Sequence, residues 1–187
     1  MQPATEYVPA TADPKKMGGR CSDNYIMPNA MAIHNVNTNA NTPVAQIQAV
    51  REDATEISTL VSFSIPAWTA NMTCKTGIAA NRLGVGDDLR GAQTVDIFST
   101  LLTDIRNTPS GNQRNKHLAR LRFNSTTKLF DFDVNTVTPQ IQEFPAPAGV
   151  TLQWEIVAVG FPDRVLIGQD FAQGGWAKPN GIFIEIQ

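Results

Sequence analysis

The chain has 187 residues, of which 42% are hydrophobic and 17% charged, enough for one ordinary globular domain with its own core. Its formal net charge of −2 excludes a strong general attraction to nucleic acid or to an anionic membrane. Because no segment approaches the roughly eighteen apolar residues of a membrane-spanning helix, we also expect no membrane span.

The chain is expected to begin with an arm. Residues 1–20 are rich in Pro, Gly, Ala and Thr without apolar periodicity, which predicts a flexible or extended N-terminal arm before a single domain at 21–187. The first residues lack the basic start and apolar run of a signal peptide, so the chain is either cytosolic or starts at a mature terminus. Potential N-glycosylation acceptors at Asn71 and Asn124, with a polar composition poor in charge, favour an extracellular protein.

Alternation of apolar and polar residues with a period of two predicts strands along the first half of the chain. The expected strands are 30–36, 44–54 and 55–66. The second of these is also compatible with a short helical turn, and Pro66 ends the third because proline cannot donate to a sheet. We expect a loop at 37–43 and a turn region from Trp68 to Gly77.

The second half of the chain shows the same alternation of apolar and polar residues, interrupted by turns and loops. Residues 78–92 include GVGDD, which lacks the spacing of a phosphate or calcium loop and is expected to be a plain turn. A polar loop at 103–116 and a proline-rich crossing at 135–149 separate further strands, expected at 94–102, 117–124, 128–134, 151–160, 164–167 and 181–187.

Two of these segments carry more specific expectations. The short connection between 117–124 and 128–134 predicts a hairpin. The strand at 151–160 starts with one polar face and ends apolar on both faces, so it is expected to enter the covered centre of a sheet. About eight to ten strands without a convincing long helix predict an all-β fold, namely a two-sheet β-sandwich of jelly-roll-like topology.

The sequence holds two cysteines, Cys21 and Cys74. They would form one disulfide in an oxidising compartment, or remain as two buried free thiols. Neither has metal-ligand spacing to another Cys or His, so no metal site and no cofactor are expected. His34 is expected to be a structural histidine with a satisfied ring.

Arg120 and Arg122 project from the same face of their expected strand. Arginine presents a rigid fork of donors, so this pair is a candidate site for an acidic sugar or phosphate group. The favoured alternative is cross-strand pairing with Asp131 and Asp133 on the neighbouring strand, an ordinary stabilising arrangement.

Asp131 and Asp133 also raise the question of catalysis, because two carboxylates about 7 Å apart resemble a glycoside hydrolase pair. Nothing in the sequence supplies the apolar pocket that would raise one pKa, and opposing arginines would keep both groups ionised. No serine has the surroundings of a nucleophile elbow either. We therefore expect no enzyme, with a glycan-active hydrolase or lyase as the weakest alternative.

Two tryptophans fall in turn regions, Trp68 and Trp176, and the second is preceded by Gly174 and Gly175. Exposed aromatic rings are suitable platforms for stacking on sugars, so both are candidate ligand-binding residues. The alternative is a loop tryptophan folded back over a sheet edge.

Several segments, taken in order, resemble a fungal domain family named for the C-terminal domain of proteins reported to bind a ubiquitin-like modifier. The matching segments are VSFSIPAWTANMTCK, GAQTVDIFSTL, HLARLRF, FPAPAGVTLQWEIVAVG and GIFIEIQ. The resemblance implies a secreted or cell-surface fungal β-domain without known enzyme activity. The family often carries a cysteine where this chain has Ala146, which implies that Cys74 either pairs with Cys21 or stays free.

Together these observations predict a non-enzymatic, secreted or cell-wall-associated fungal protein that binds a glycan, such as a cell-wall polysaccharide, or a surface protein. A protein-interaction module, either an effector or a binder of a ubiquitin-like modifier, is the alternative. No residue pattern for modifier binding can be transferred to this chain.

Overall fold

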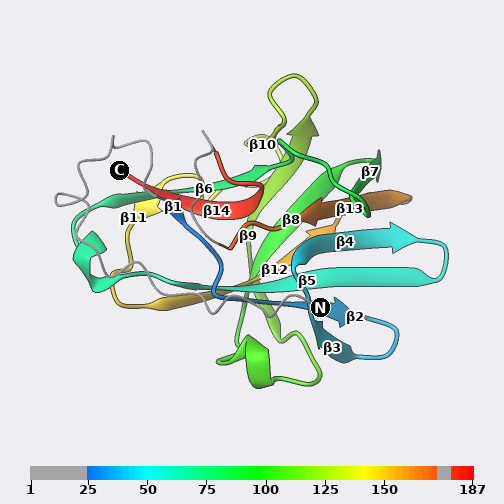
Figure 1. Ribbon diagram of the computed structural model, residues 1–187, viewed down its shortest axis with the longest axis horizontal. Coiled ribbons are helices and arrows are strands. Elements are labelled where there is room, and N and C mark those ends of the chain that lie inside the picture. The colour runs from blue at the N-terminus through cyan, green and yellow to red at the C-terminus, as the bar shows by residue number, and fades with distance from the viewer. Residues whose placement is uncertain (1–24, 172–177) are drawn as a thin grey trace.

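The computed structural model describes residues 25–171 and 178–187, and within these ranges the fold is all-β (Figure 1). The strands are β1 (Tyr25–Ile26), β2 (Ala30–Asn35), β3 (Ala40–Pro43), β4 (Gln46–Glu52), β5 (Thr55–Ser64), β6 (Thr73–Ala79), β7 (Asp88–Gly91), β8 (Thr94–Thr100), β9 (Arg114–Asn124), β10 (Leu129–Phe132), β11 (Phe144–Pro145), β12 (Thr151–Ala158), β13 (Asp163–Gly168) and β14 (Gly181–Ile186). Single 3₁₀ turns occupy Ala67–Thr69 and Ile105–Asn107.

Some predictions fall outside these residues. The N-terminal arm, Cys21 and Trp176 all lie outside the described ranges. In the part of the chain that is described, no helix has the length and apolar character needed to cross a membrane.

The prediction of two separate sheets is not confirmed. Hydrogen bonds join the strands into one antiparallel sheet with the order β1-β14-β6-β10-β9-β8-β12-β5-β4-β13-β7. Off this path, β11 pairs with β6, β2 pairs with β5, and β3 pairs with β2. The continuity comes from β5, whose ten residues are long enough to serve several partners. One edge of β5 pairs with β4 at its start and with β12 further along, while β2 covers the other edge.

Strand β12 occupies the centre of the sheet, as its sequence predicts. It lies between β8 and β5 and is paired along most of its length with both. Trp154, Ile156 and Ala158 point into the main hydrophobic core, whereas Glu155 points to the opposite face and is completely buried there. A central strand therefore places apolar side chains and one carboxylate in positions that water does not reach.

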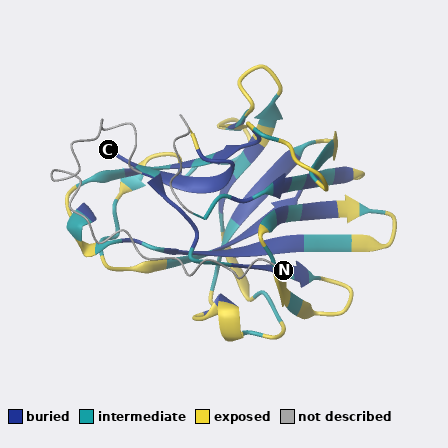
Figure 2. Ribbon diagram, viewed as in Figure 1, coloured by how far each residue is buried: buried dark blue, intermediate teal, exposed yellow. Residues whose placement is uncertain are grey.

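The sheet curls so that strands far apart in its order share one core. Ile47 of β4, Ile167 of β13 and Ile184 of β14 belong to the same buried cluster. Strands β4 and β14 are in contact although β6, β10, β9, β8, β12 and β5 separate them in the sheet. Figure 2 shows the result, with buried residues along the middle of the strands and exposed ones at loops and hairpin tips. The twist of antiparallel strands favours such curling.

Three segments predicted as loops or turns are partly strands. The expected loop 37–43 contains β3, which forms a hairpin with β2. The expected turn region from Trp68 to Gly77 contains most of β6, which pairs with β14 over six positions, and the region 78–92 contains β7. In each case a distant or neighbouring strand supplies hydrogen bonds that local composition does not reveal.

Other local expectations are confirmed. Residues 46–52 form a strand rather than a helical turn, and β9 and β10 form the predicted hairpin, in which Phe123 lies opposite Phe130. The GVGDD segment is a turn whose Asp87 carboxylate accepts hydrogen bonds from the backbone N–H groups of Gly84 and Gly168, both at 2.8 Å. Asp87 therefore has a structural role in fastening this turn to the end of β13.

Candidate binding groove

The two predicted arginines lie on β9 but have different surroundings. Arg120 forms two hydrogen bonds of 2.8 Å with the carboxylate of Asp96 on β8, and these bonds raise its pKa. Arg122 is exposed and lies opposite Asp131 in the hairpin register. Of the predicted pairing with Asp131 and Asp133, the structure shows Arg122 in register with Asp131, whereas the ion-pair partner of Arg120 is on the other neighbouring strand. The sequence signal for this pairing was Asp96, an acidic residue within the largely apolar β8 segment.

A second buried acid organises the same face of the sheet. Glu155 accepts hydrogen bonds from Ser58 Oγ at 2.6 Å and Asn112 Nδ2 at 3.0 Å, and from two nitrogens of Arg114 at 2.8 and 3.0 Å. The guanidinium of Arg114 also lies 4.8 Å from the centroid of the Phe98 ring. Burial raises the pKa of Glu155, but the hydrogen bonds from Arg114, Ser58 and Asn112 outweigh it, so the pKa lies below its usual 4.5.

This cluster closes the outer face of the sheet. Asn112 and Arg114 stand at the end of the long loop that follows β8, so their bonds to Glu155 fasten that loop to the central strand. Within the loop, Leu102 and Ile105 are buried against Ala32 and Leu60 as a separate small core. The charged groups of Asp96, Arg114, Arg120 and Glu155 are therefore engaged with each other, so this part of the face is a structural layer.

The other predicted ligand-binding residue within the described ranges is Trp68. It lies in the 3₁₀ turn Ala67–Thr69, is half-buried, and packs against the main core. This placement agrees with the alternative expectation of a tryptophan folded over the sheet. His34 is likewise buried, and its Nδ1 lies 2.8 Å from Asn41 Oδ1, as expected for a structural histidine.

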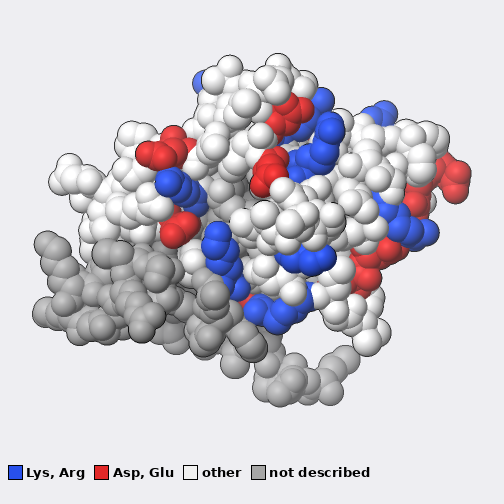
Figure 3. Space-filling model, turned by 90° about the horizontal axis from the view of Figure 1, so that it is seen from above, with Lys and Arg blue, Asp and Glu red and all other residues white. Residues whose placement is uncertain are grey.

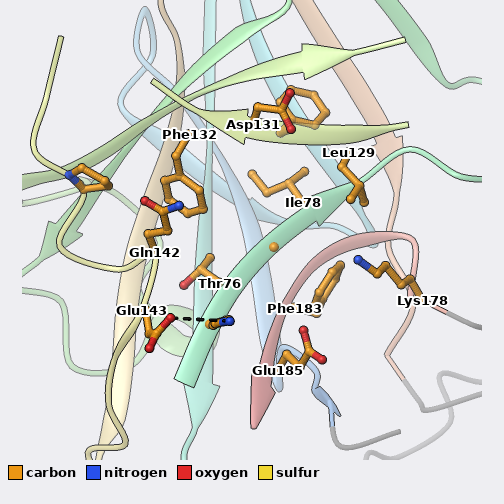
Figure 4. Close-up of a pocket in the computed structure, with 14 residues that line it drawn as sticks. Thr76, Ile78, Leu129, Asp131, Phe132, Gln142, Glu143, Lys178, Phe183 and Glu185 are labelled. Carbon is orange, nitrogen blue, oxygen red and sulfur yellow. Dashed lines mark ion pairs between the residues drawn. The ribbon is translucent and has the colours of Figure 1, made fainter. Parts of the chain in front are cut away.

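A larger concave feature than this face offers lies where β6 and β10 diverge. These strands pair at Leu129 and Ala79, and beyond that point β11 pairs with β6 at Cys74 and Thr73. Between these two contacts the sheet opens into a groove of about 670 Å³, bounded by β6, β10, β14 and residues 139–143. We call this feature the β6–β10 groove, and its lining is drawn in Figure 4.

The floor of the β6–β10 groove is apolar. Ile78 and Phe130 are buried beneath it, and Leu129 and Phe132 are half-buried along its β10 side. Gly77 leaves room for the ring of Phe183, because a Cβ at this position would lie 2.4 Å from Phe183 Cζ. Thr76 is also buried in the lining, and its Oγ1 has no hydrogen-bond partner among the described residues.

The rim of the groove is polar and carries both signs of charge. Lys75 forms an ion pair of 3.5 Å with Glu143, marked by the dashed line in Figure 4. The remaining polar rim residues are Asp131, Gln142, Lys178 and Glu185. None of these was singled out as a groove residue from the sequence. The one available signal was Gly77, since a glycine within a strand often marks a close approach.

The two aspartates considered as a catalytic pair line one surface hollow beside Arg122, but different groups hold them. Asp131 lines the groove and accepts a hydrogen bond of 2.8 Å from Asn124 Nδ2. Asp133 instead accepts hydrogen bonds from the Thr136 hydroxyl at 2.7 Å and from the backbone of Asn135 and Thr136. The bond from Thr136 lowers the pKa of Asp133, which is opposite to the shift that a general acid needs.

The remaining predictions concern the two cysteines and a metal site. Cys74 has no disulfide partner among the described residues and no exposed surface, and burial raises the pKa of its thiol to about 11. Because Cys21 lies outside the described residues, the disulfide stays a prediction. Among the residues that the structure describes, no group of three or more His, Cys, Asp or Glu side chains is arranged to hold a metal ion.

Comparison of the chain with protein-family models, with curated proteins and with solved structures gave no match. The resemblance to the fungal domain family, which rests on segment order, therefore stays a prediction.

The buried Glu155 leads to a prediction on stability. Replacing Glu155 with Gln should lower the free energy of unfolding by about 3 kcal/mol, the lower part of the range for breaking a buried ion pair, because Arg114 still reaches solvent. Urea unfolding at pH 7 measures this. Glu143→Gln, which breaks an exposed pair, should change it by less than about 0.5 kcal/mol.

The same carboxylate gives a pH dependence. Since the pKa of Glu155 is lowered on folding, the unfolded chain binds its proton more readily, and the stabilisation is present above about pH 4.5 and lost as the pH falls through the folded pKa. The unfolding free energy of Glu155→Gln should fall less than that of the wild type below pH 4.5. Parallel curves for the two proteins would contradict this assignment.

The buried thiol can be tested directly. We expect iodoacetamide at pH 8 to leave Cys74 unmodified in the native protein, because the thiol is buried and its pKa of about 11 leaves almost no thiolate. In denaturant without reductant, peptide mass spectrometry should find Cys74 alkylated. Alkylation that requires prior reduction would show a disulfide instead.

Proposed function

We propose that this protein is a non-catalytic binding domain that holds a neutral glycan in the β6–β10 groove. The observation that carries the proposal is the opening of the sheet between β6 and β10, with an apolar floor and a polar rim. Ligand sites are commonly concave, mostly apolar surfaces with a few polar groups that orient the ligand.

The charge of the rim supports a neutral ligand. Two lysines, Lys75 and Lys178, stand among the carboxylates of Asp131, Glu143 and Glu185, so neither sign dominates. Sugar hydroxyls both donate and accept hydrogen bonds, which matches a rim of ammonium, amide and carboxylate groups. A strongly anionic or cationic polymer would meet like charges along part of the same rim.

The floor supports a ligand with apolar faces. Phe132 and Leu129 offer half-buried side chains beside the opening, against which the CH groups of a sugar ring can pack. The hydroxyl of Thr76, which is buried in the groove lining and has no partner among the described residues, can donate or accept a further hydrogen bond. A bound hydroxyl would satisfy it.

The test is a glycan array of neutral oligosaccharides probed with the full chain, followed by titration calorimetry on the glycans that bind. Replacing both Asp131 and Gln142 with Ala should weaken binding about thirtyfold, because each substitution removes a rim hydrogen bond worth about 1 kcal/mol. Gln140→Ala is the matched control, since Gln140 is an exposed amide of the same segment that does not line the groove.

Two results would contradict the proposal. One is the absence of binding to any neutral glycan on the array. The other is binding that the double variant leaves as tight as in the control, which would place the glycan site outside the groove.

We further propose a secreted or cell-wall-associated location. Both predicted acceptors are in surface turns: Asn71 is exposed with a φ of 68°, and Asn124 begins the exposed turn between β9 and β10. The hydrogen bond from Asn124 Nδ2 to Asp131 uses the nitrogen that would carry the sugar, so modification would leave one N–H on that nitrogen and place the sugar at the edge of the groove.

The location is tested by the intact mass of protein from its native host, before and after enzymatic removal of N-glycans. A mass decrease that maps to Asn71 or Asn124 is expected. A mass unchanged by the treatment at both sites would count against the secretory route.

A further inference from the structure

Strand β7 forms one end of the sheet, and among the residues that the structure describes it is hydrogen-bonded to another strand along one edge only. Its partner there is β13, which pairs with Asp88, Leu89, Arg90 and Gly91. Ala92 N donates to Pro162 O at 3.3 Å, so the alternation of an antiparallel ladder turns the backbone groups of Leu89 away from β13. The Leu89 carbonyl accepts a bond from the side chain of Gln93, which agrees with this direction.

A row of alternating charges leads across the outer face to this edge. Glu52 on β4 pairs with Arg164 on β13 at 2.6 Å, and Arg164 lies 3.9 Å from Asp88 on β7. Asp88 in turn pairs with Arg90, the last member of the row, whose side chain is 62% exposed. In Figure 3 acidic and basic side chains alternate at the end of the molecule where the β4–β5 hairpin projects.

The sequence of β7 is complementary to itself in one antiparallel register. A twofold axis through Leu89 places Asp88 opposite Arg90 of a second copy and Arg90 opposite its Asp88. An axis through Arg90 or Asp88 would place like charges opposite each other, which is destabilising. We propose that β7 pairs with β7 of a second copy of this chain about an axis through Leu89.

The backbone and the ends of the strand fit this partner. In this register the outward N–H and C=O of the two Leu89 residues bond to each other, and the Gln93 amide gives up the position that it fills in the single chain. Val85 precedes one end of β7 and is fully exposed, and Phe161, 68% exposed, lies beside the other end. The twofold axis brings Phe161 of each copy toward Val85 of the other.

The pairing is independent of the proposed glycan site. The β6–β10 groove is formed by β6, β10 and β14, none of which pairs with β7. A dimer through β7 therefore leaves both grooves accessible and gives the assembly two of them, which raises its avidity for a repeating ligand.

The test is the concentration dependence of mass for the full chain by sedimentation velocity, where a dimer has twice 20.3 kDa. Because the edge is short, we expect a weak dimer that forms below about 1 mM. Arg90→Glu and Asp88→Arg should each raise the dissociation constant at least about tenfold, since each places two like-charge pairs across the axis. Lys116→Glu, an exposed charge reversal on β9, is the matched control.

Mixing the two variants provides the decisive measurement. In a mixed dimer, Asp88 and the glutamate introduced at position 90 belong to one chain. They face Arg90 and the arginine introduced at position 88 of the other chain. The equimolar mixture should therefore associate more tightly than either variant alone. A melting curve for each variant checks that it is folded. A wild type that stays monomeric to about 1 mM, a dimer that both variants leave unchanged, or a mixture that fails to associate would each overturn the proposed pairing.

Discussion

The burial of one carboxylate at the centre of the sheet governs much of this structure. Glu155 has no exposed surface, and removing a charge from water costs far more than a typical single contact returns. Bonds from Arg114, Ser58 and Asn112 offset that cost, and they fix two separate segments, β5 and the end of the loop after β8, relative to β12. The loop after β8 is thereby held over the outer face, where Leu102 and Ile105 form their own small core. Because only a matching set of hydrogen-bond donors offsets the cost of burying Glu155, this carboxylate specifies how the segments around it are arranged.

The curl of the sheet accounts for both its core and its opening. Strands from opposite ends of the sheet order contribute to one hydrophobic cluster, so the inner face is fully covered without a second sheet. Such curvature is not uniform, and between β6 and β10 the strands part after one pairing position. The proposed ligand groove is therefore a consequence of how the sheet closes on itself. Residues 139–143, from the proline-rich crossing, then supply part of its wall.

The edges of the sheet differ in how they are protected. Strand β3 ends at Pro43, which cannot donate to a further strand, whereas β7 carries charges of both signs and a side-chain bond from Gln93 to its free carbonyl. Charged edges usually prevent uncontrolled pairing with other strands. The same charges select one partner when their order is complementary to itself, so that protection against aggregation and a specific twofold contact are compatible at β7.

The sequence by itself determined the all-β class, the position of most strands and the central place of β12, because period-two alternation records which face of a strand is buried. It also indicated that His34 is structural and that the strand with Arg122 forms a hairpin with the strand that carries Asp131. Only the tertiary structure decided that the strands form one curled sheet, that Arg120 pairs with Asp96, and that β6 and β10 diverge to form a groove. These features depend on strand order and twist, which join segments far apart in the chain and leave no local periodicity to detect.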